Sequence, residues 1–226
     1  MIPGRQFILF AEGTRNDHFD AGFDLNFSWQ FYGALKAVYD GQSASSIFTV
    51  HHNEYDNLSG GKHWIRFTTN HDESAWDATP VVLFNGIDGA LAASVVTIFT
   101  GGVPLIYAGQ EVGTADNVPF FSNSNTDWDG NPNMKMAYQD ILQFYSDSEV
   151  AKKGINGVFP HNDVACFKKM LNNEEILIIA NLRNNPLEFD VPIGLQNSTW
   201  TNIRNHENIT LGDEMTLDPY AYLILD

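Results

Sequence analysis

The sequence predicts an α/β protein in which four parallel strands alternate with helices and are followed by a small antiparallel β domain. Short apolar runs alternate with segments of helical periodicity over residues 1–152, which is typical of a parallel sheet covered by helices. Over residues 153–226, strand-like runs are separated by turn residues such as Asn172 and Asn173, with no helical pattern between them. We therefore expect two domains with these boundaries.

The composition narrows the kind of partner. The chain has 226 residues, of which 43% are hydrophobic and 13% aromatic, as expected for a well-packed globular protein. Its net charge of −16 argues against binding to nucleic acid or to anionic membrane surfaces, because both are bound through Lys and Arg. No run of about 18 apolar residues is available for a membrane-spanning helix. A neutral ligand such as a sugar fits this charge.

The amino terminus and the single cysteine say little about the compartment. Residues 1–6 show no signal peptide, since they lead almost at once into an apolar run, and the localisation stays open. Cys166 lies in an apolar, alternating stretch and is expected to be a buried thiol.

Two strands are predicted near the amino terminus. Residues 7–11 are continuously apolar, which predicts a strand buried on both faces of a parallel sheet. This strand ends at Glu12, and a carboxylate at the end of a buried strand costs free energy unless it is paired or used. Residues 23–29 alternate between apolar and polar side chains and predict a second strand.

A helix and a loop are predicted next. Residues 31–39 carry apolar side chains at helical spacing, and Asp40-Gly41 should end this helix. Residues 43–62 are mixed and rich in Gly, so we expect a loop with one helical turn. The His51-His52 pair within it suggests a metal site, but the segment offers no Cys and few acidic partners at ligand spacing.

Polar side chains follow the third predicted strand. Residues 64–69 begin as a short alternating run, which suits a strand with one packed face, and the run stops at Asn70, His71 and Asp72. An amide, an imidazole and a carboxylate at this point are held by a rigid element yet face a ligand-accessible mouth. The alternative is an ordinary polar strand end followed by a turn.

The rest of the first domain continues the alternation. We expect a loop or frayed helix over 78–88, a buried helix over 89–100, a strand over 103–107, an irregular loop over 118–133 and a helix over 134–145. In a parallel sheet the carboxyl ends of all strands lie at one edge. The side chains that follow three of the strands, Glu12, Asp72 and Gln110-Glu111, should therefore converge.

The second domain is predicted from short strands alone. They cover residues 158–167, 176–182, 187–193, 200–202 and 220–225.

The order of these motifs resembles the carboxyl-terminal portion of an α-amylase family glycoside hydrolase. F-I-L-F-A-E-G, G-F-D-L-N-F-S-W, T-T-N-H-D-E and G-V-P-L-I-Y-A-G-Q-E are similar to barrel strands five to eight of that family. N-T-D-W-D-G-N-P and the following helix resemble the last barrel helix, and the tail resembles the family's β-sandwich domain. The resemblance implies the second half of a (β/α)8 TIM barrel followed by a small antiparallel β-sandwich.

The resemblance also implies roles for individual residues. Glu12 matches the general acid/base, and Asp72 matches a third family carboxylate that binds sugar hydroxyls and favours the distorted ring. His71 matches a hydrogen-bond donor to the same sugar, and Asn70 belongs with it in substrate binding. Trp76 could stack on a sugar or pack as an exposed edge. Glu111 is expected to anchor the site from behind, without touching the reacting atoms.

The sequence departs from the family in one respect that matters for catalysis. A retaining glycosidase needs two carboxylates about 5 Å apart, one of which acts as nucleophile. The family's nucleophile precedes the glutamate strand in an R-x-D motif, whereas Arg15 and Asp17 follow Glu12. We expect no cofactor or metal on this portion, because the family's calcium sites would lie mainly in the missing half and Asp127-Trp-Asp-Gly-Asn131 lacks a later bidentate Glu.

Three hypotheses follow from the sequence. The first is a truncated or split hydrolase of α-glucans or maltooligosaccharides that is active only with an amino-terminal half-barrel. The second is a non-catalytic or vestigial carbohydrate-binding protein, and the third is an unrelated β/α fold. Because half a barrel has two open strand edges, we expect it to pair with the missing half or to self-associate.

Overall fold

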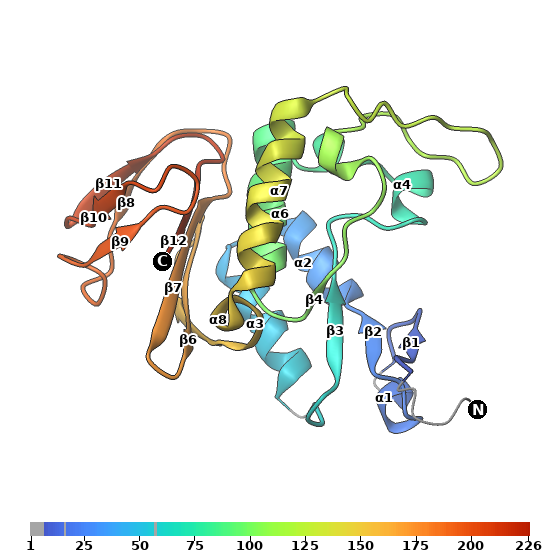
Figure 1. Ribbon diagram of the computed structural model, residues 1–226, viewed down its shortest axis with the longest axis horizontal. Helices are drawn as coiled ribbons and strands as arrows, with labels where there is room; N and C mark the ends of the chain where they lie inside the picture. The colour runs from blue at the N-terminus through green and yellow to red at the C-terminus, as the bar shows by residue number, and fades with distance from the viewer. Residues whose placement is uncertain (1–6, 16, 57) are drawn as a thin grey trace.

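The computed structural model describes residues 7–15, 17–56 and 58–226, and Figure 1 shows its layers. A parallel sheet and an antiparallel sheet lie on opposite sides of a layer of helices. The expectation of no signal peptide rested on residues 1–6, which lie outside the described residues. Within the described part of the chain, no helix combines the length and apolarity needed to cross a membrane.

The predicted four-stranded parallel sheet is confirmed. Its strands run in the order β1-β2-β3-β4, and every neighbouring pair is parallel. The strands are β1 (Phe10–Ala11), β2 (Leu25–Phe27), β3 (His63–Arg66) and β4 (Val103–Pro104). They are shorter than predicted, but they still bring all four carboxyl ends to one edge.

The prediction that residues 7–11 are buried on both faces is wrong. Phe7, Ile8 and Phe10 are 57%, 73% and 46% exposed, respectively, although Ala11 is buried. The reason is position, because β1 is an edge strand that pairs only with β2 among the described residues. The structure therefore presents an apolar segment at an open strand edge, where unpaired backbone groups can accept a further strand.

The helices predicted over 31–39, 89–100 and 134–145 are confirmed, whereas the helix over Ser45–Tyr55 and several short helices were not predicted. The long helices are α2 (Trp29–Tyr39), α3 (Ser45–Tyr55), α6 (Ile87–Phe99) and α7 (Pro132–Asp147). The shorter ones are α1 (Asp17–Asp20), α4 (Glu73–Trp76), α5 (Pro80–Leu83), α8 (Glu149–Lys153) and the 3-10 helix η1 (Gln110–Val112). The expected loop over 43–62 is wrong, because Ala44, Ile47 and Phe48 form a buried helical face and the glycines come only after α3.

The second part of the chain consists of antiparallel strands. They are β5 (Ile155–Phe159), β6 (Val164–Leu171), β7 (Glu174–Asn181), β8 (Leu187–Asp190), β9 (Thr199–Thr201), β10 (Asn208–Thr210), β11 (Glu214–Leu217) and β12 (Tyr222–Leu225). The sheet β12-β7-β6-β5 packs against the smaller pairs β8–β11 and β9–β10. The predicted strand over 158–167 is two strands, and the sequence reading missed β10 and β11.

Alternating residues bury the four-stranded antiparallel sheet on both faces. Phe167 and Ile178 belong to the core shared with α6 and α7, whereas Cys166 and Ile179 face the smaller strand pairs. The predicted burial of Cys166 is confirmed, and burial raises the pKa of its thiol to about 12. The sheet is therefore a central layer, with helices on one side and strands on the other.

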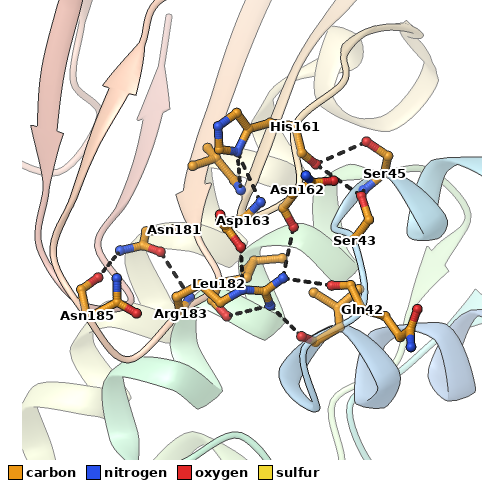
Figure 2. A network of polar contacts seen from close by, with 12 residues as sticks. Gln42, Ser43, Ser45, His161, Asn162, Asp163, Asn181, Leu182, Arg183 and Asn185 are labelled. Atoms are coloured by element: carbon orange, nitrogen blue, oxygen red, sulfur yellow. Dashed lines mark hydrogen bonds and ion pairs between the residues drawn. The ribbon is translucent and has the colours of Figure 1, made fainter.

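Figure 2 shows how Arg183, which follows β7, links the antiparallel part of the chain to the segment after α2. Its Nε donates to Asp163 Oδ1 at 2.7 Å, and its Nη2 donates to the carbonyl oxygens of Gln42 and Asn162 at 2.7 and 2.9 Å. Its Nη1 donates to the carbonyl of Val38, near the end of α2. One guanidinium thus satisfies backbone carbonyls from both parts of the chain, and its charge strengthens each bond.

A second arginine, Arg66, is the last residue of β3, and its side chain is completely buried. Its guanidinium pairs with Glu54, and its Nε donates to Gly101 O at 2.9 Å. The same group lies 3.0 Å from His51 Nδ1. Burial and the charge of Arg66 lower the pKa of His51 to about 3, so His51 is neutral and accepts this bond. We predicted one packed face for this strand, but pairing of Arg66 allows both faces to be buried.

Replacement of Arg66 by Leu is expected to lower the free energy of unfolding by about 3–5 kcal/mol, because it leaves the buried carboxylate of Glu54 unpaired. The double variant R66L/E54L removes both charges and should recover most of the loss. Urea unfolding monitored by circular dichroism measures both values. Equal losses in the single and double variants would contradict the importance of the unpaired charge.

Lys169 of β6 makes the stability of the contact between β6 and α8 depend on pH. Its side chain is buried, its Nζ donates to Ala151 O at 2.5 Å, and burial lowers its pKa from 10.5 to about 8. The folded chain therefore loses this proton at a lower pH than the unfolded chain, and stability rises between about pH 8 and 10.5. Lys169→Met should be about 2 kcal/mol more stable than wild type at pH 7, with the difference shrinking as the pH rises.

Denaturant unfolding at pH 7, 8.5 and 10 checks this dependence. Lys168→Met is the matched control, because Lys168 lies next along the strand but pairs with Glu175 at a partly exposed position. This control should change stability by less than about 1 kcal/mol. A gain for Lys169→Met that does not vary with pH would contradict the argument.

Candidate active site

Three of the predicted residues meet at the carboxyl edge of the parallel sheet. His71 Nε2 lies 3.2 Å from Glu12 Oε1 and 3.7 Å from Asp72 Oδ1. One ligand atom from each of the three side chains lies within 4.8 Å of the others. All three side chains are about half exposed, at 52%, 44% and 38% for Glu12, His71 and Asp72. The strand ends therefore bring two carboxylates and an imidazole to one solvent-accessible point.

Asn70 positions two of these residues from below. Its side chain is buried, and its Oδ1 accepts hydrogen bonds from the backbone N–H groups of Asp72 and Glu73, both at 2.9 Å. These bonds make the chain turn sharply from the end of the strand into α4. His71 and Asp72 therefore project at the carboxyl edge of the parallel sheet, which we call the rim. The structure gives Asn70 a positioning contact, and its predicted contact with substrate stays a prediction.

Gln110 does not join the rim, contrary to the expected convergence of Gln110-Glu111. Its Nε2 donates to Thr68 Oγ1 and to Tyr138 OH, both at 2.8 Å, and its side chain is buried. Ser94 Oγ completes the network at 2.6 Å from Tyr138 OH. Burial raises the pKa of Tyr138 to about 12, so its hydroxyl keeps its proton. An amide turns inward here because the polar groups of three elements need a common partner.

Glu111, the predicted anchor, follows Gln110 in η1 (Gln110–Val112). Its Oε2 is buried without a hydrogen-bond partner among the described residues. No hydrogen bond or ion pair in the described part of the chain joins it to Glu12, His71 or Asp72. Its role as an anchor behind the site stays a prediction.

An aromatic cluster lies beside the three charged residues. Trp76, at the end of α4, is 73% exposed, and its ring centroid lies 5.4 Å from that of Phe120. Phe120 lies 6.1 Å from the His71 ring and 6.0 Å from Phe121, which is 96% exposed. The sequence reading named Trp76 but missed the two phenylalanines. The signal was present, because two consecutive aromatic residues are unusual within an otherwise polar loop.

A second group of aromatic residues packs around Phe67, which follows β3. Phe67 is buried and lies between Phe27, Trp29 and Tyr32, with ring centroids 5.1–5.3 Å apart. Tyr32 OH lies 3.5 Å from Asp77 Oδ2. Burial, together with the negative charges of Glu73 and Asp77, raises the pKa of Tyr32. These packed rings therefore fix the segment after β3, and the hydroxyl of Tyr32 keeps its proton.

The structure also defines where cations could be held. Glu12, His71 and Asp72 are the one group of three or more His, Cys, Asp or Glu side chains among the described residues with a spacing suited to a metal ion. At the His51-His52 pair, by contrast, the Nδ1 of His51 is already bonded to Arg66. In the Asp127 loop, Asp127 Oδ1 accepts a local hydrogen bond from Asp129 N at 3.1 Å.

The fold and the position of these residues define a class of protein. It has a parallel β/α sheet with acid, amide and imidazole groups at its carboxyl edge, followed by an antiparallel β domain. Residues 157–224 match the family model described as Maltogenic Amylase, C-terminal domain. No curated protein sequence matches the chain.

Solved structures share this fold over nearly the whole chain. The maltogenic α-amylase AmyB from Thermotoga neapolitana superposes with a TM-score of 0.81 at 17% identity, covering 99% of this chain and 55% of that one. The α-amylase from Geobacillus thermoleovorans gives 0.77 at 16% identity, with 97% and 53% covered. The α-amylase from H. orenii gives 0.70 at 20% identity, with 96% and 53% covered.

The resemblance to the carboxyl-terminal portion of α-amylase family enzymes is therefore confirmed by the family model and by the shared fold. The chain spans about half the length of the solved structures it matches. This agreement argues against the hypothesis of an unrelated β/α fold.

The contacts of Asn70 generate a prediction for the site. Asn70→Ala leaves two backbone N–H groups without their acceptor and should lower the free energy of unfolding by about 1–2 kcal/mol. Amide hydrogen exchange at Asp72 and Glu73 should accelerate more than elsewhere. Asn205→Ala, which removes an equivalent but exposed acceptor for Glu207 N, should cost less than about 0.5 kcal/mol. Equal effects of the two substitutions would contradict a positioning role for Asn70.

Proposed function

We propose that this chain is the acid/base portion of a retaining α-amylase-type glycoside hydrolase that cleaves α-1,4-glucosidic bonds in starch-like glucans. The observation that carries the proposal is the meeting of Glu12, His71 and Asp72 within 4.8 Å at the carboxyl edge of a parallel sheet. Active sites of β/α barrel enzymes are built at this edge, from residues that follow several different strands.

Glu12 is the general acid/base of the proposed reaction. Its proton passes to the glycosidic oxygen, so that the leaving saccharide departs as an alcohol while a nucleophilic carboxylate bonds to the anomeric carbon. The ionised Glu12 then takes a proton from water, which attacks the same carbon and releases the nucleophile. The half-exposed side chain of Glu12 is consistent with access to both the leaving group and water.

His71 and Asp72 bind the sugar whose bond is broken. Asp72 accepts hydrogen bonds from sugar hydroxyls, and its negative charge favours the oxocarbenium-like transition state. His71 donates to the same sugar, and its position between the two carboxylates directs its ring towards the reacting group. Asn70 keeps both residues at the rim through its bonds to the backbone.

The nucleophile is proposed to come from a second half-barrel. Among the described residues, no third carboxylate belongs to the cluster of Glu12, His71 and Asp72. The apolar, exposed segment 7–10 flanks an open parallel edge, which suits the addition of further strands. We propose that four more strands complete an eight-stranded barrel there, while self-association through the same edge is the competing outcome.

The proposed substrate is a neutral α-glucan or maltooligosaccharide. A chain with net charge −16 does not favour anionic polymers, and the exposed aromatic rings near His71 suit the apolar faces of sugar rings. Proteins with this fold have been solved with maltose, maltotriose and acarbose.

The test is complementation. The chain is mixed with a separately expressed amino-terminal half-barrel that carries the R-x-D strand, and release of reducing ends from starch is measured. We expect activity in the mixture, and Glu12→Gln should lower it by about a thousandfold because the variant cannot transfer the proton. Asp116→Asn, at an exposed carboxylate with no hydrogen bond or ion pair to the three site residues in the described part of the chain, should leave the rate within about twofold.

The same experiment separates the second candidate, a non-catalytic carbohydrate-binding protein. The exposed Trp76 beside His71 is the observation that favours it. Absence of hydrolysis in the mixture, together with maltooligosaccharide binding by this chain alone, would replace the hydrolase proposal with the binding one.

A further inference from the structure

A cavity lies between α3 and β5, where the helical layer meets an edge strand of the antiparallel sheet (Figure 1). Its volume is about 250 Å³, just below the range of about 300–1,000 Å³ that is typical of sites for drug-sized ligands, so it suits a molecule of one or two rings. The cavity shares no lining residue with the cluster of Glu12, His71 and Asp72. It is therefore separate from the candidate active site.

The wall formed by α3 is aromatic because of helical spacing. Phe48, His51 and Tyr55 occupy positions i, i+3 and i+7, so they share one face of the helix, and all three line the cavity. The ring of Phe48 packs against that of Phe167 on β6, with centroids 5.1 Å apart. The rings of His51 and Tyr55 have centroids 4.8 Å apart. These contacts fix the aromatic wall before any ligand enters.

His51 supplies this wall with a hydrogen-bond donor. Its Nδ1 lies 3.0 Å from Arg66 Nη2 and accepts a hydrogen bond from it. A neutral imidazole carries a single proton, so the proton of His51 must be on Nε2. In the described part of the chain, this N–H donates no hydrogen bond.

The wall formed by β5 combines apolar side chains with one amide. Ile155 and Val158 line the cavity beside Asn156. The Nδ2 of Asn156 donates to the carbonyl oxygen of Thr100 at 2.6 Å, which fixes the orientation of the amide. Its Oδ1 is buried and has no hydrogen-bond partner among the described residues. A buried carbonyl oxygen without a partner costs free energy, and a donor group on a ligand at this wall removes that cost.

We propose that this cavity binds a small neutral aromatic molecule that carries a carboxamide group. The carbonyl oxygen of the ligand accepts from His51 Nε2–H, and its N–H donates to Asn156 Oδ1. Its ring packs between Tyr55 on one wall and Ile155 on the other. A carboxylate in place of the amide lacks the N–H donor and brings a negative charge towards the unpaired oxygen of Asn156.

A bound ligand would also strengthen contacts that exist without it. When a ligand accepts from Nε2–H of His51, the imidazole becomes polarised, and its Nδ1 is a better acceptor for Arg66. The same ligand contacts β5, so it joins the first part of the chain to the second. Because these walls come together only in the folded chain, binding should stabilise the folded state. The site does not depend on the proposed hydrolase activity.

The experiment compares benzamide with benzoate, which has the same ring but a charged carboxylate. Each compound is titrated into the full chain, and binding is followed by two-dimensional NMR. Benzamide should bind with a Kd of about 1 mM, as expected for a ligand of this size, and benzoate at least about tenfold more weakly. Nuclear Overhauser contacts should join the benzamide ring to the methyl groups of Ile155 and Val158.

Two matched variants locate the site. Ile155→Trp places a large ring at an exposed position on the cavity wall, where the native side chain is 76% exposed, and should weaken benzamide binding by at least about tenfold. Ile193→Trp makes the same change at a position that is 88% exposed and does not line the cavity, and should leave the affinity within about twofold. Circular dichroism should show that both variants keep their fold, because neither position is buried.

Two further measurements test the hydrogen bonds and the stabilisation. Asn156→Ala removes the amide oxygen, so the preference for benzamide over benzoate should fall to less than about threefold. Benzamide should raise the midpoint of thermal unfolding of the wild type and of Ile193→Trp but not that of Ile155→Trp.

Four results would overturn the inference. They are no saturable binding of benzamide by the wild type up to about 20 mM, equal affinities for benzamide and benzoate, an unchanged affinity in Ile155→Trp, or tighter binding of benzylammonium than of benzamide. The last result would indicate a cation site formed with Asp56, which also lines the cavity.

Discussion

The position of the candidate site depends on one buried charge. Arg66, at the end of β3, pairs with Glu54 of α3 and bonds to the carbonyl of Gly101, which precedes β4. A guanidinium in the interior is tolerated only when its partners are in place, so these three elements are fixed relative to one another. Asn70 begins the rim four residues after Arg66, and the precision of the site therefore derives from an ion pair buried beneath it.

The polar side chains at the carboxyl edge of the sheet differ in burial according to their type. Asn70 and Gln110 are buried and satisfy backbone or hydroxyl groups, whereas Glu12, His71 and Asp72 remain about half exposed. A buried amide oxygen costs little once it accepts hydrogen bonds, whereas burial of a charged group costs much more unless that group is paired. The result is a set of buried, paired polar groups below Glu12, His71 and Asp72, which remain where a ligand can reach them.

Hydrophobic pattern and strand order allowed the parallel sheet, α2, α6 and the meeting of Glu12 with Asp72 to be predicted. Three errors have identifiable physical causes. The run 7–11 looked like a central strand because apolarity does not reveal whether a neighbouring strand is present. The helix α3 was missed because its polar face masked a short apolar one, and Phe120 was missed because loop geometry depends on hydrogen bonds such as Val118 to Ser74.

Because the antiparallel sheet β12-β7-β6-β5 is buried on both faces, the two parts of the chain cannot be separated without exposing apolar surface. Phe167 and Ile178 on one face and Cys166 and Ile179 on the other belong to different cores but to the same two strands. A recombination event or a proteolytic cut near residue 153 would uncover the α6 side of that sheet on one fragment and its partner helices on the other. Both parts are therefore expected to be inherited, exchanged and degraded as one unit.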